Sequence, residues 1–527
     1  MKISDIPQNV SRRILLNLYT PIEKEQGLDT KLNLIFNKDL DLIRVYRLQE
    51  VRKELLEKER KRLERKALYG KRRRKQLFKL HESGFYKSYL QEDKIEVLLD
   101  EKTRDAKTFR RKFRVPYIIF MKIVDEISNS TDSRWNCLKT QRNEISESAG
   151  ADPIPHTILV LCSLRILGRN LFPDDVHDLC GVSETKIRNY FRDFVMIYGS
   201  YLFKKLVKAP SPNDMDELNK CMYPYKIVGL PGCIASVDCV HVQWEAPNFL
   251  KHSCANGRFG GKLKTMVFQV AVSNDRKILS ATQAFYGTMN DTVVARYDSF
   301  VQDVLKGVYR NVNYQMYNER GQKREHAGCW LLVDGGYSKS YPHLQYPVSC
   351  SSMNLDNYQL SKHKESVRKD VECCFGILKK RFLILKTSIR STREEITAPI
   401  FHTCCALHNW LLHHDEVTLV TDASGVNGME YPSDSESDSD DEDTPNHFYK
   451  SHNNDYIRRL RYPEDMDGYE DSDDNTDGDG SVLQLGRMTN NEFRGHLRNN
   501  FKEQKIKEGI KWPKYSRKKW LKQTRSR

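Results

Sequence analysis

The chain has 527 residues, a formal net charge of +15 and a sequence pI of about 9.0, so it is long enough for several domains and its basic excess favours a polyanionic partner such as nucleic acid. No run of about 18 apolar residues occurs and the first residues lack a signal-peptide core, so we expect no membrane span. The 13 cysteines include no CxxC pair, which indicates reduced thiols rather than a disulfide scaffold.

Residues 1–107 are predicted to form a basic, charged, helical N-terminal region. Two clusters stand out, KERKRLERK (58–66) and KRRRK (71–75), and the second contains Arg72, Arg73 and Arg74. A solvated helix is one interpretation. Because cations outnumber acids too strongly for simple i,i+4 pairing, nuclear import or binding to a DNA backbone is the other.

Residues 108–210 are predicted to form a compact helical domain. The segment FPDDVHDLCGVSETKIRNYFRDFVMIYG (172–199) has the spacing of a helix-turn-helix, with a turn at Gly181 and Ser183 as N-cap. Lys186, Arg188 and Asn189 would lie on the exposed part of the second helix, where they could contact phosphates and base edges. An ordinary αα-hairpin is the alternative.

Residues 211–414 are predicted to form an α/β domain with a mixed sheet flanked by helices. Strands are expected at 232–244, 264–273 and 278–287, followed by one helix over 290–305 with Asn290 as N-cap. A further strand ends near residue 334, and a helix covers 365–385. In the closing block FHTCCALHNWLLHH (401–414), Cys404 and His408 could share a zinc ion, but no distal pair completes a four-ligand set.

The rest of the chain divides by charge. Residues 415–480 are predicted to be an acidic, disordered linker, because runs such as YPSDSESDSDDEDTP (431–445) cannot bury a core. Residues 481–527 are predicted to be a basic C-terminal tail.

Three acids of the α/β domain are candidate metal ligands. Asp238 lies inside the apolar run GCIASVDCVHVQW, Asp334 ends GCWLLVDGGY, and Glu372 lies on the predicted helix ESVRKDVECCFGILKKRFLIL. A carboxylate in an apolar strand is costly unless it is paired or bound to a cation. Carboxylate oxygens suit Mg²⁺ or Mn²⁺, and two such ions can clamp the attacking and leaving oxygens of a phosphodiester.

Each acid also has a plain structural interpretation. Asp334 precedes two glycines and could simply form a turn, and Glu372 could pair with Arg368 at i,i+4 on an exposed helix face. Asp238 is the hardest to explain in this way, because its neighbours are apolar. Asp291 is interpreted as a helix-start or loop acid with a supporting role, and Asp370 as a surface residue.

Several blocks occur together in one order and resemble a known family. They are SVDCVHVQWEAPN (236–248), QAFYGTMNDTVVARYDSF (283–300), LLVDGGYSKSYP (331–342), RKDVECCFGILKKRF (368–382) and CCALHNWLL (404–412). The chain resembles Harbinger-type (PIF/Harbinger) DDE transposases, in the branch called plant transposon proteins. The resemblance implies an RNase H-like catalytic domain with Asp238, Asp334 and Glu372 as catalytic acids and metal ligands. The family usually has Arg after the glutamate, where this chain has Cys373.

The implied function is that of a nuclear DNA transposase or transposase-derived endonuclease. It would use two Mg²⁺ or Mn²⁺ ions to hydrolyse phosphodiester bonds at transposon ends and to transfer strands. Double-stranded DNA, a Myb-like accessory protein and further copies of the chain are the expected partners. The main alternative is a domesticated, non-catalytic DNA-binding or chromatin-associated protein. A nuclease acting on structured RNA is a third interpretation.

Overall fold

The structure is a computed structural model that describes residues 77–140, 151–245, 254–255, 263–348, 355–423 and 482–508, together with Glu57 and Arg60. The chain divides into two compact units, Met1–Gln76 and Leu77–Arg527. The cluster that contains Arg72, Arg73 and Arg74 lies outside the described residues. Among the described helices, none is long and apolar enough to cross a membrane.

The compact helical part of the second unit includes residues 77–107, whereas the sequence assigned them to the charged helical N-terminal region and placed the start of the compact domain at residue 108. Phe85 and Tyr89 are buried, and the Tyr89 ring meets the Phe113 ring edge-on with centroids 5.1 Å apart. Residues 77–107 therefore share a core with the residues that follow. The helices of this part are α3 (Glu92–Leu99), α4 (Arg104–Phe113), α5 (Tyr117–Asn129), α7 (His156–Arg169), α8 (Pro173–Cys180), α9 (Glu184–Asp193) and α10 (Ser200–Leu206).

Local signals fix where several of these helices begin and end. Thr103 caps α4, since its side-chain oxygen accepts a hydrogen bond from the Ala106 amide at 3.1 Å. Asn170 ends α7 with a φ of 52°, and Gly181 ends α8 with a φ of 75°. A residue in the left-handed region stops a helix because it turns the chain away from the helix axis.

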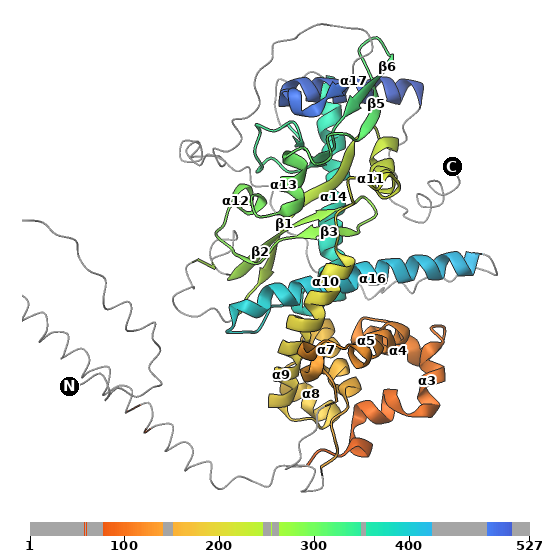
Figure 1. Ribbon diagram of the computed structural model, residues 1–527, viewed down its shortest axis with the longest axis vertical. Helices are drawn as coiled ribbons and strands as arrows, with labels where there is room; N and C mark the ends of the chain where they lie inside the picture. Colours follow the sequence, from red (N-terminus) through yellow and green to blue (C-terminus); the bar gives the residue numbers. More distant parts are fainter. Residues whose placement is uncertain are drawn as a thin grey trace, which may run out of the picture. The chain divides into compact units, whose positions relative to one another are not determined.

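The α/β part contains a mixed sheet, which confirms the expected α/β class. The strand order is β3-β2-β1-β7-β8, and β4 pairs with β2. The pairs β1–β2 and β2–β3 are antiparallel, whereas β1–β7 and β7–β8 are parallel. The strands are β1 (Cys233–Gln243), β2 (Thr265–Val272), β3 (Ile278–Ala281), β4 (Phe285–Tyr286), β7 (Trp330–Leu332) and β8 (Leu344–Gln345) (Figure 1).

Helices cover both faces of this sheet. Successive side chains of a strand point to opposite faces. In β1, Val240 and Val242 pack on the side of α14 (Leu355–Arg381) and α16 (Thr397–Ala423), whereas Val237 packs on the side of α11 (Met215–Ile227) and α13 (Ser299–Leu305). Along α14, Val371, Cys374 and Leu378 form a buried apolar stripe, and Phe382, directly after the helix, is buried with them.

The helix predicted over residues 290–305 is divided into two. Asn290 caps α12 (Asp291–Ala295) as predicted, with its Oδ1 accepting from the Thr292 amide at 2.9 Å. A second cap follows at Asp298, whose carboxylate accepts from the Phe300 and Val301 amides at 3.0 and 3.3 Å. The second cap starts α13 as a separate helix. A helix pattern alone did not reveal this interruption.

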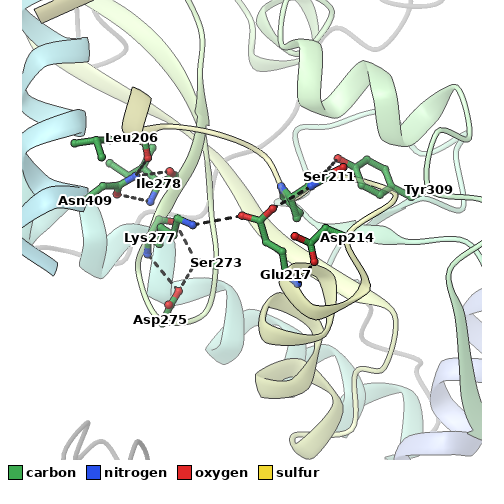
Figure 2. Close-up of polar contacts among 11 residues, drawn as sticks. Leu206, Ser211, Asp214, Glu217, Ser273, Asp275, Lys277, Ile278, Tyr309 and Asn409 are labelled. Atoms are coloured by element: carbon green, nitrogen blue, oxygen red, sulfur yellow. Dashed lines mark hydrogen bonds and ion pairs between the residues drawn. The ribbon is translucent and has the colours of Figure 1, made fainter. Parts of the chain in front are cut away.

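Asn409 of α16 connects the helical part to the sheet. Its Oδ1 accepts from the Ile278 amide at 2.9 Å, and its Nδ2 donates to the carbonyls of Ile278 at 2.7 Å and Leu206 at 3.0 Å. Figure 2 shows this side chain between β3 and the end of α10, with Lys277 directed toward Glu217 at 3.8 Å. One buried amide therefore fixes three segments that are distant in sequence.

Part of the C-terminal region predicted to be a basic tail is folded. Strand β9 (Leu483–Gln484) pairs in parallel with β6 (Lys323–Ala327), which is itself antiparallel to β5 (Asn313–Tyr317). Helix α17 (Asn490–Lys507) lies beside β5 and β6 (Figure 1). Its buried side chains Phe493, Leu497 and Phe501 share a core with Trp330 of β7.

A buried polar chain joins α17 to the helix that carries Glu372. Lys364 of α14 donates to Gln345 Oε1 at 2.7 Å, and Gln345 Nε2 donates to Asn490 Oδ1 at 3.1 Å. Burial holds the pKa of Lys364 well below its ordinary value. These contacts make residues 482–508 part of the α/β core.

We expect Phe493→Ala to lower the free energy of unfolding by about 3–5 kcal/mol, because it empties a fully buried site beside Trp330. Ile506→Ala is the matched control on the same helix, since Ile506 is 70% exposed and should change stability by less than about 0.5 kcal/mol. Urea denaturation of both variants measures the difference. Equal stability of the two variants would mean that α17 adds nothing to the core.

Candidate functional site

The pairing of β1 with β7 brings two of the predicted acids side by side. Ser236 of β1 lies opposite Leu332 of β7 in a parallel register. Two residues farther along each segment lie Asp238 in β1 and Asp334 just after β7. The two acids therefore occupy equivalent positions on the same face. Neighbouring strands are about 4.8 Å apart, so the two carboxylates lie close together where β7 ends. We call this place the acidic edge of the sheet.

Helix α14 brings the third acid to this edge. Arg368 and Glu372 lie one turn apart, and Arg368 Nη2 donates to Glu372 Oε1 at 2.6 Å. Arg368 Nη1 donates to Asp238 Oδ2 at 2.8 Å. Farther along α14, Lys379 donates to the His241 carbonyl of β1 at 2.8 Å. The helix is therefore fixed against β1 by polar contacts as well as by its apolar stripe.

Burial dominates the electrostatics of Asp238. Its pKa rises to about 6, first because burial penalises the charged form, and further because Asp334 and Glu372 add negative charge. The Arg368 guanidinium acts in the opposite direction, and so does the hydrogen bond that Asp238 Oδ1 accepts from the Cys239 amide at 2.8 Å. The pair with Arg368 only partly offsets the cost of burying this charge.

Asp291 is a further acid of the site to which the sequence gave only a supporting role. It is 3% exposed, and a Cβ placed at Gly336 would lie 3.1 Å from Asp334 Oδ1 and 3.5 Å from Asp291 Oδ2. Thr292 donates to the Gly336 carbonyl at 2.8 Å, which fixes the start of α12 against the Asp334 turn. The pair Asn290–Asp291 at a helix start was the sequence signal for this placement.

The interpretation of Asp370 as a surface residue was wrong. Its carboxylate accepts from Asn274 at 3.1 Å and pairs with Arg276 at 3.5 Å, and its side chain is 14% exposed. Asp370 lies two residues before Glu372 and so points in a different direction around the helix. It holds the turn between β2 and β3 against α14.

The donors at the sheet edge match a hard divalent cation in kind, because carboxylate oxygens are the ligands that Mg²⁺ and Mn²⁺ prefer. In the part of the chain that the structure describes, no three His, Cys, Asp or Glu side chains are already arranged to hold an ion. The Arg368 guanidinium lies between Asp238 and Glu372. A cation shared by these acids requires Arg368 to move.

The zinc alternative at the closing block gains no support. Cys404 is buried, which raises the pKa of its thiol well above the ordinary value. His408 Nε2 instead lies 3.0 Å from the Arg276 carbonyl and 3.7 Å from Cys374 Sγ. The histidine serves as a packing and hydrogen-bonding residue between α16 and α14.

The three DNA-binding candidates on α9 differ in exposure. Arg188 and Asn189 are exposed, and Lys186 is half-buried, with its pKa lowered by burial. Arg188 forms an ion pair with Glu184 on the same helix. Helix α8 contributes Asp174, Asp175 and Asp178, so any contact of this segment with phosphate must come from α9.

Comparisons with known proteins find a family match over the α/β domain. Residues 204–419 match the model of a family described as plant transposon protein, so the match begins inside α10 and ends inside α16, of which it contains the larger part. The match contains Asp238, Asp334 and Glu372. No solved structure matches the chain significantly.

Individual relatives extend the comparison. "Protein ALP1-like" of Arabidopsis thaliana is 24% identical over 315 residues, which is 60% of this chain and 73% of that protein. "Putative nuclease HARBI1" of Xenopus laevis is 28% identical over 209 residues, and that of Bos taurus is 25% identical over 193 residues. These matches cover 39% and 36% of this chain, and they span 53% and 49% of the two nuclease relatives, about half of their length.

The α/β domain is thus similar to transposase-derived and nuclease-like proteins. The chain is related to Harbinger transposase-derived proteins, which confirms the resemblance inferred from its sequence blocks.

For metal-free protein in chelator, we expect Asp238→Asn to raise the free energy of unfolding at pH 7.5 by about 1–3 kcal/mol. The pKa of Asp238 in the folded protein, about 6, exceeds the ordinary value of 3.8, so the folded state of the wild type is stabilised while this carboxyl is protonated. The wild type loses that stability as the pH rises from 3.8 through about 6. The difference in free energy of unfolding between the variant and the wild type should therefore grow between pH 3.8 and about pH 6 and then level off. Urea denaturation across this range measures it.

The matched control is Asp303→Asn, because Asp303 is an exposed acid on α13. Its stability should follow that of the wild type at every pH within about 0.5 kcal/mol. A constant difference between Asp238→Asn and the wild type would show that the Asp238 carboxylate is not strained by burial.

Proposed function

We propose that the protein is a divalent-metal-dependent DNA endonuclease of the transposase type. The observation that carries this proposal is the parallel register of β1 and β7, which sets Asp238 beside Asp334 on the face where α14 presents Glu372. Three acids from two strand segments and a helix, spread between residues 238 and 372, are thus candidates for one shared cation site. The family match and the nuclease names of two relatives support the same chemistry.

The topology supports an RNase H-like assignment for the α/β domain. Three antiparallel strands come first in the chain, helices follow, and β7 then joins β1 in parallel before the long helix α14. This order agrees with the β-β-β-α-β…α order expected from the sequence, except that β4 and the hairpin β5–β6 come between β3 and β7, and β8 comes before α14. It places acids from the first strand, the parallel strand and the long helix at a common edge.

In the proposed reaction, Asp238 and Asp334 would hold the metal, and Glu372 would complete a second site. When bound, Mg²⁺ or Mn²⁺ would polarise the phosphodiester and supply an activated water. The Asp334 turn, fixed by Thr292 and by the bond from the Gly336 amide to Asp334 Oδ1 at 2.8 Å, would keep one carboxylate in place. The substrate would be a transposon end, and the freed 3′-hydroxyl would then attack target DNA.

DNA contact would involve α9 and the basic N-terminal region. Arg188 and Asn189 are exposed and adjacent on α9, as base readout requires, with Lys186 nearer the core. The cluster with Arg72, Arg73 and Arg74 would add sequence-independent phosphate contacts and direct the protein to the nucleus. A Myb-like accessory protein and self-association complete this proposal.

A non-catalytic DNA-binding protein is the second candidate. The observation that favours it is the Arg368 guanidinium between Asp238 and Glu372, which neutralises the acids without a metal. The similarity to "Protein ALP1-like" fits either function. A cleavage assay on DNA separates the two, and a parallel RNA–DNA hybrid substrate tests the RNA nuclease alternative.

We expect Asp238→Ala, Asp334→Ala and Glu372→Ala each to lower Mg²⁺-dependent cleavage of duplex DNA carrying the terminal repeats by more than about 100-fold, since losing even an outer-shell partner can cost that much. DNA binding should persist because these acids do not attract phosphate. Glu365→Ala on the same helix is the control and should cleave normally. Near-normal cleavage by a triad variant would remove that acid from the site.

Substitution of exposed side chains on α9 should alter the preference of the protein among DNA sequences. Arg188→Ala or Asn189→Ala should reduce discrimination between the preferred duplex and a mismatched one by about 1–3 kcal/mol per lost base contact. Lys204→Ala, at an exposed cation on α10, should leave this discrimination unchanged. Competition binding with matched and scrambled duplexes measures it, and unaltered preference in both α9 variants would reject the helix-turn-helix assignment.

A further inference from the structure

Among the residues that the structure describes, Arg368 is the cation that contacts both Asp238 of the strand and Glu372 of the helix. Its side chain is 12% exposed, and its two terminal nitrogens contact different carboxylates, with Nη1 2.8 Å from Asp238 Oδ2 and Nη2 2.6 Å from Glu372 Oε1. An exposed i,i+4 pair on a helix would show neither this burial nor a second partner on a strand. The sequence pattern had indicated only such a pair.

The guanidinium and a divalent cation need the same oxygen atoms. The other oxygen of Asp238 accepts from the Cys239 amide at 2.8 Å, so Oδ2 is the oxygen directed toward α14. Asp334 Oδ1 likewise accepts from the Gly336 amide at 2.8 Å. A cation shared between the strand acids and Glu372 would lie where the guanidinium lies, and two positive groups repel at such separations.

We propose that Arg368 is a built-in counter-cation that holds the acidic edge together in the metal-free protein and releases the carboxylate oxygens when a divalent cation binds. This inference rests on the proposed metal site but concerns its regulation. Arg368 lets the chain bury Asp238 beside Asp334 before any metal arrives. It also lowers the affinity of the site for a metal ion, because the ion must displace the Arg368 guanidinium each time it binds.

The test is Mn²⁺ binding by isothermal titration to the chelator-treated full chain, with Arg368→Gln compared to the wild type. We expect Arg368→Gln to bind Mn²⁺ about tenfold more tightly, since a nearby positive charge lowers the affinity of a carboxylate for a cation by at least this factor. Its metal-free melting temperature should fall, and saturating Mn²⁺ should recover most of the loss. Lys369→Gln removes the same charge from an exposed neighbouring position and should match the wild type.

Arg368→Lys is the second variant, and it covers the case in which Arg368→Gln does not fold. A lysine keeps the charge but cannot contact both acids with one planar fork. Its Mn²⁺ affinity should lie between those of the wild type and Arg368→Gln. If Arg368→Gln does not fold, the expected result is that Arg368→Lys binds Mn²⁺ more tightly than the wild type. Circular dichroism confirms that each variant is folded.

The outcomes separate this inference from the proposed function. If the wild type binds Mn²⁺ and cleaves DNA while Arg368 variants bind equally or more weakly, the counter-cation role is wrong and the nuclease proposal stands. If neither the wild type nor any folded Arg368 variant binds Mn²⁺, both proposals fail. Binding that appears only in the variants supports the displacement role and favours a protein whose metal site is closed.

Discussion

The contact between Asp238 and Arg368 is the interaction on which the α/β domain depends. An ionised carboxylate in the middle of a buried strand costs several kcal/mol, and one guanidinium from α14 offsets part of that cost. The same contact fixes the long helix to β1 and aligns Glu372 with the strand acids. The architecture of this region follows from placing a charge where an apolar side chain would be more stable.

This arrangement makes function and stability oppose each other at one site. Asp238, Asp334, Asp291 and Glu372 concentrate negative charge at the edge where β1 and β7 run in parallel. A protein selected only for stability would have neutral side chains there. The acids at this edge, together with the family match over residues 204–419, support the proposal that the edge is a reaction site.

The supporting core extends beyond the segment that matches the family. Helices before α10 pack against α16, and Asn409 connects them to β3 through main-chain bonds. At the other end, α17 covers Trp330 and reaches α14 through Gln345 and Lys364. Both additions stabilise the elements that hold the acids, and neither contributes a carboxylate to the edge.

The sequence by itself indicated the α/β class, the helix over 365–385, the Asn290 cap and three candidate acids, because these depend on local pattern and on ordered motifs. The tertiary structure decided what depends on distant partners. It made Arg368 a bridge rather than a surface pair, buried Asp291, paired the half-buried Asp370 with Arg276, divided one expected helix at Asp298, and folded α17 into the core. Periodicity along a chain reports which face a residue occupies, but the residue it meets across that face is set by strand register and helix packing.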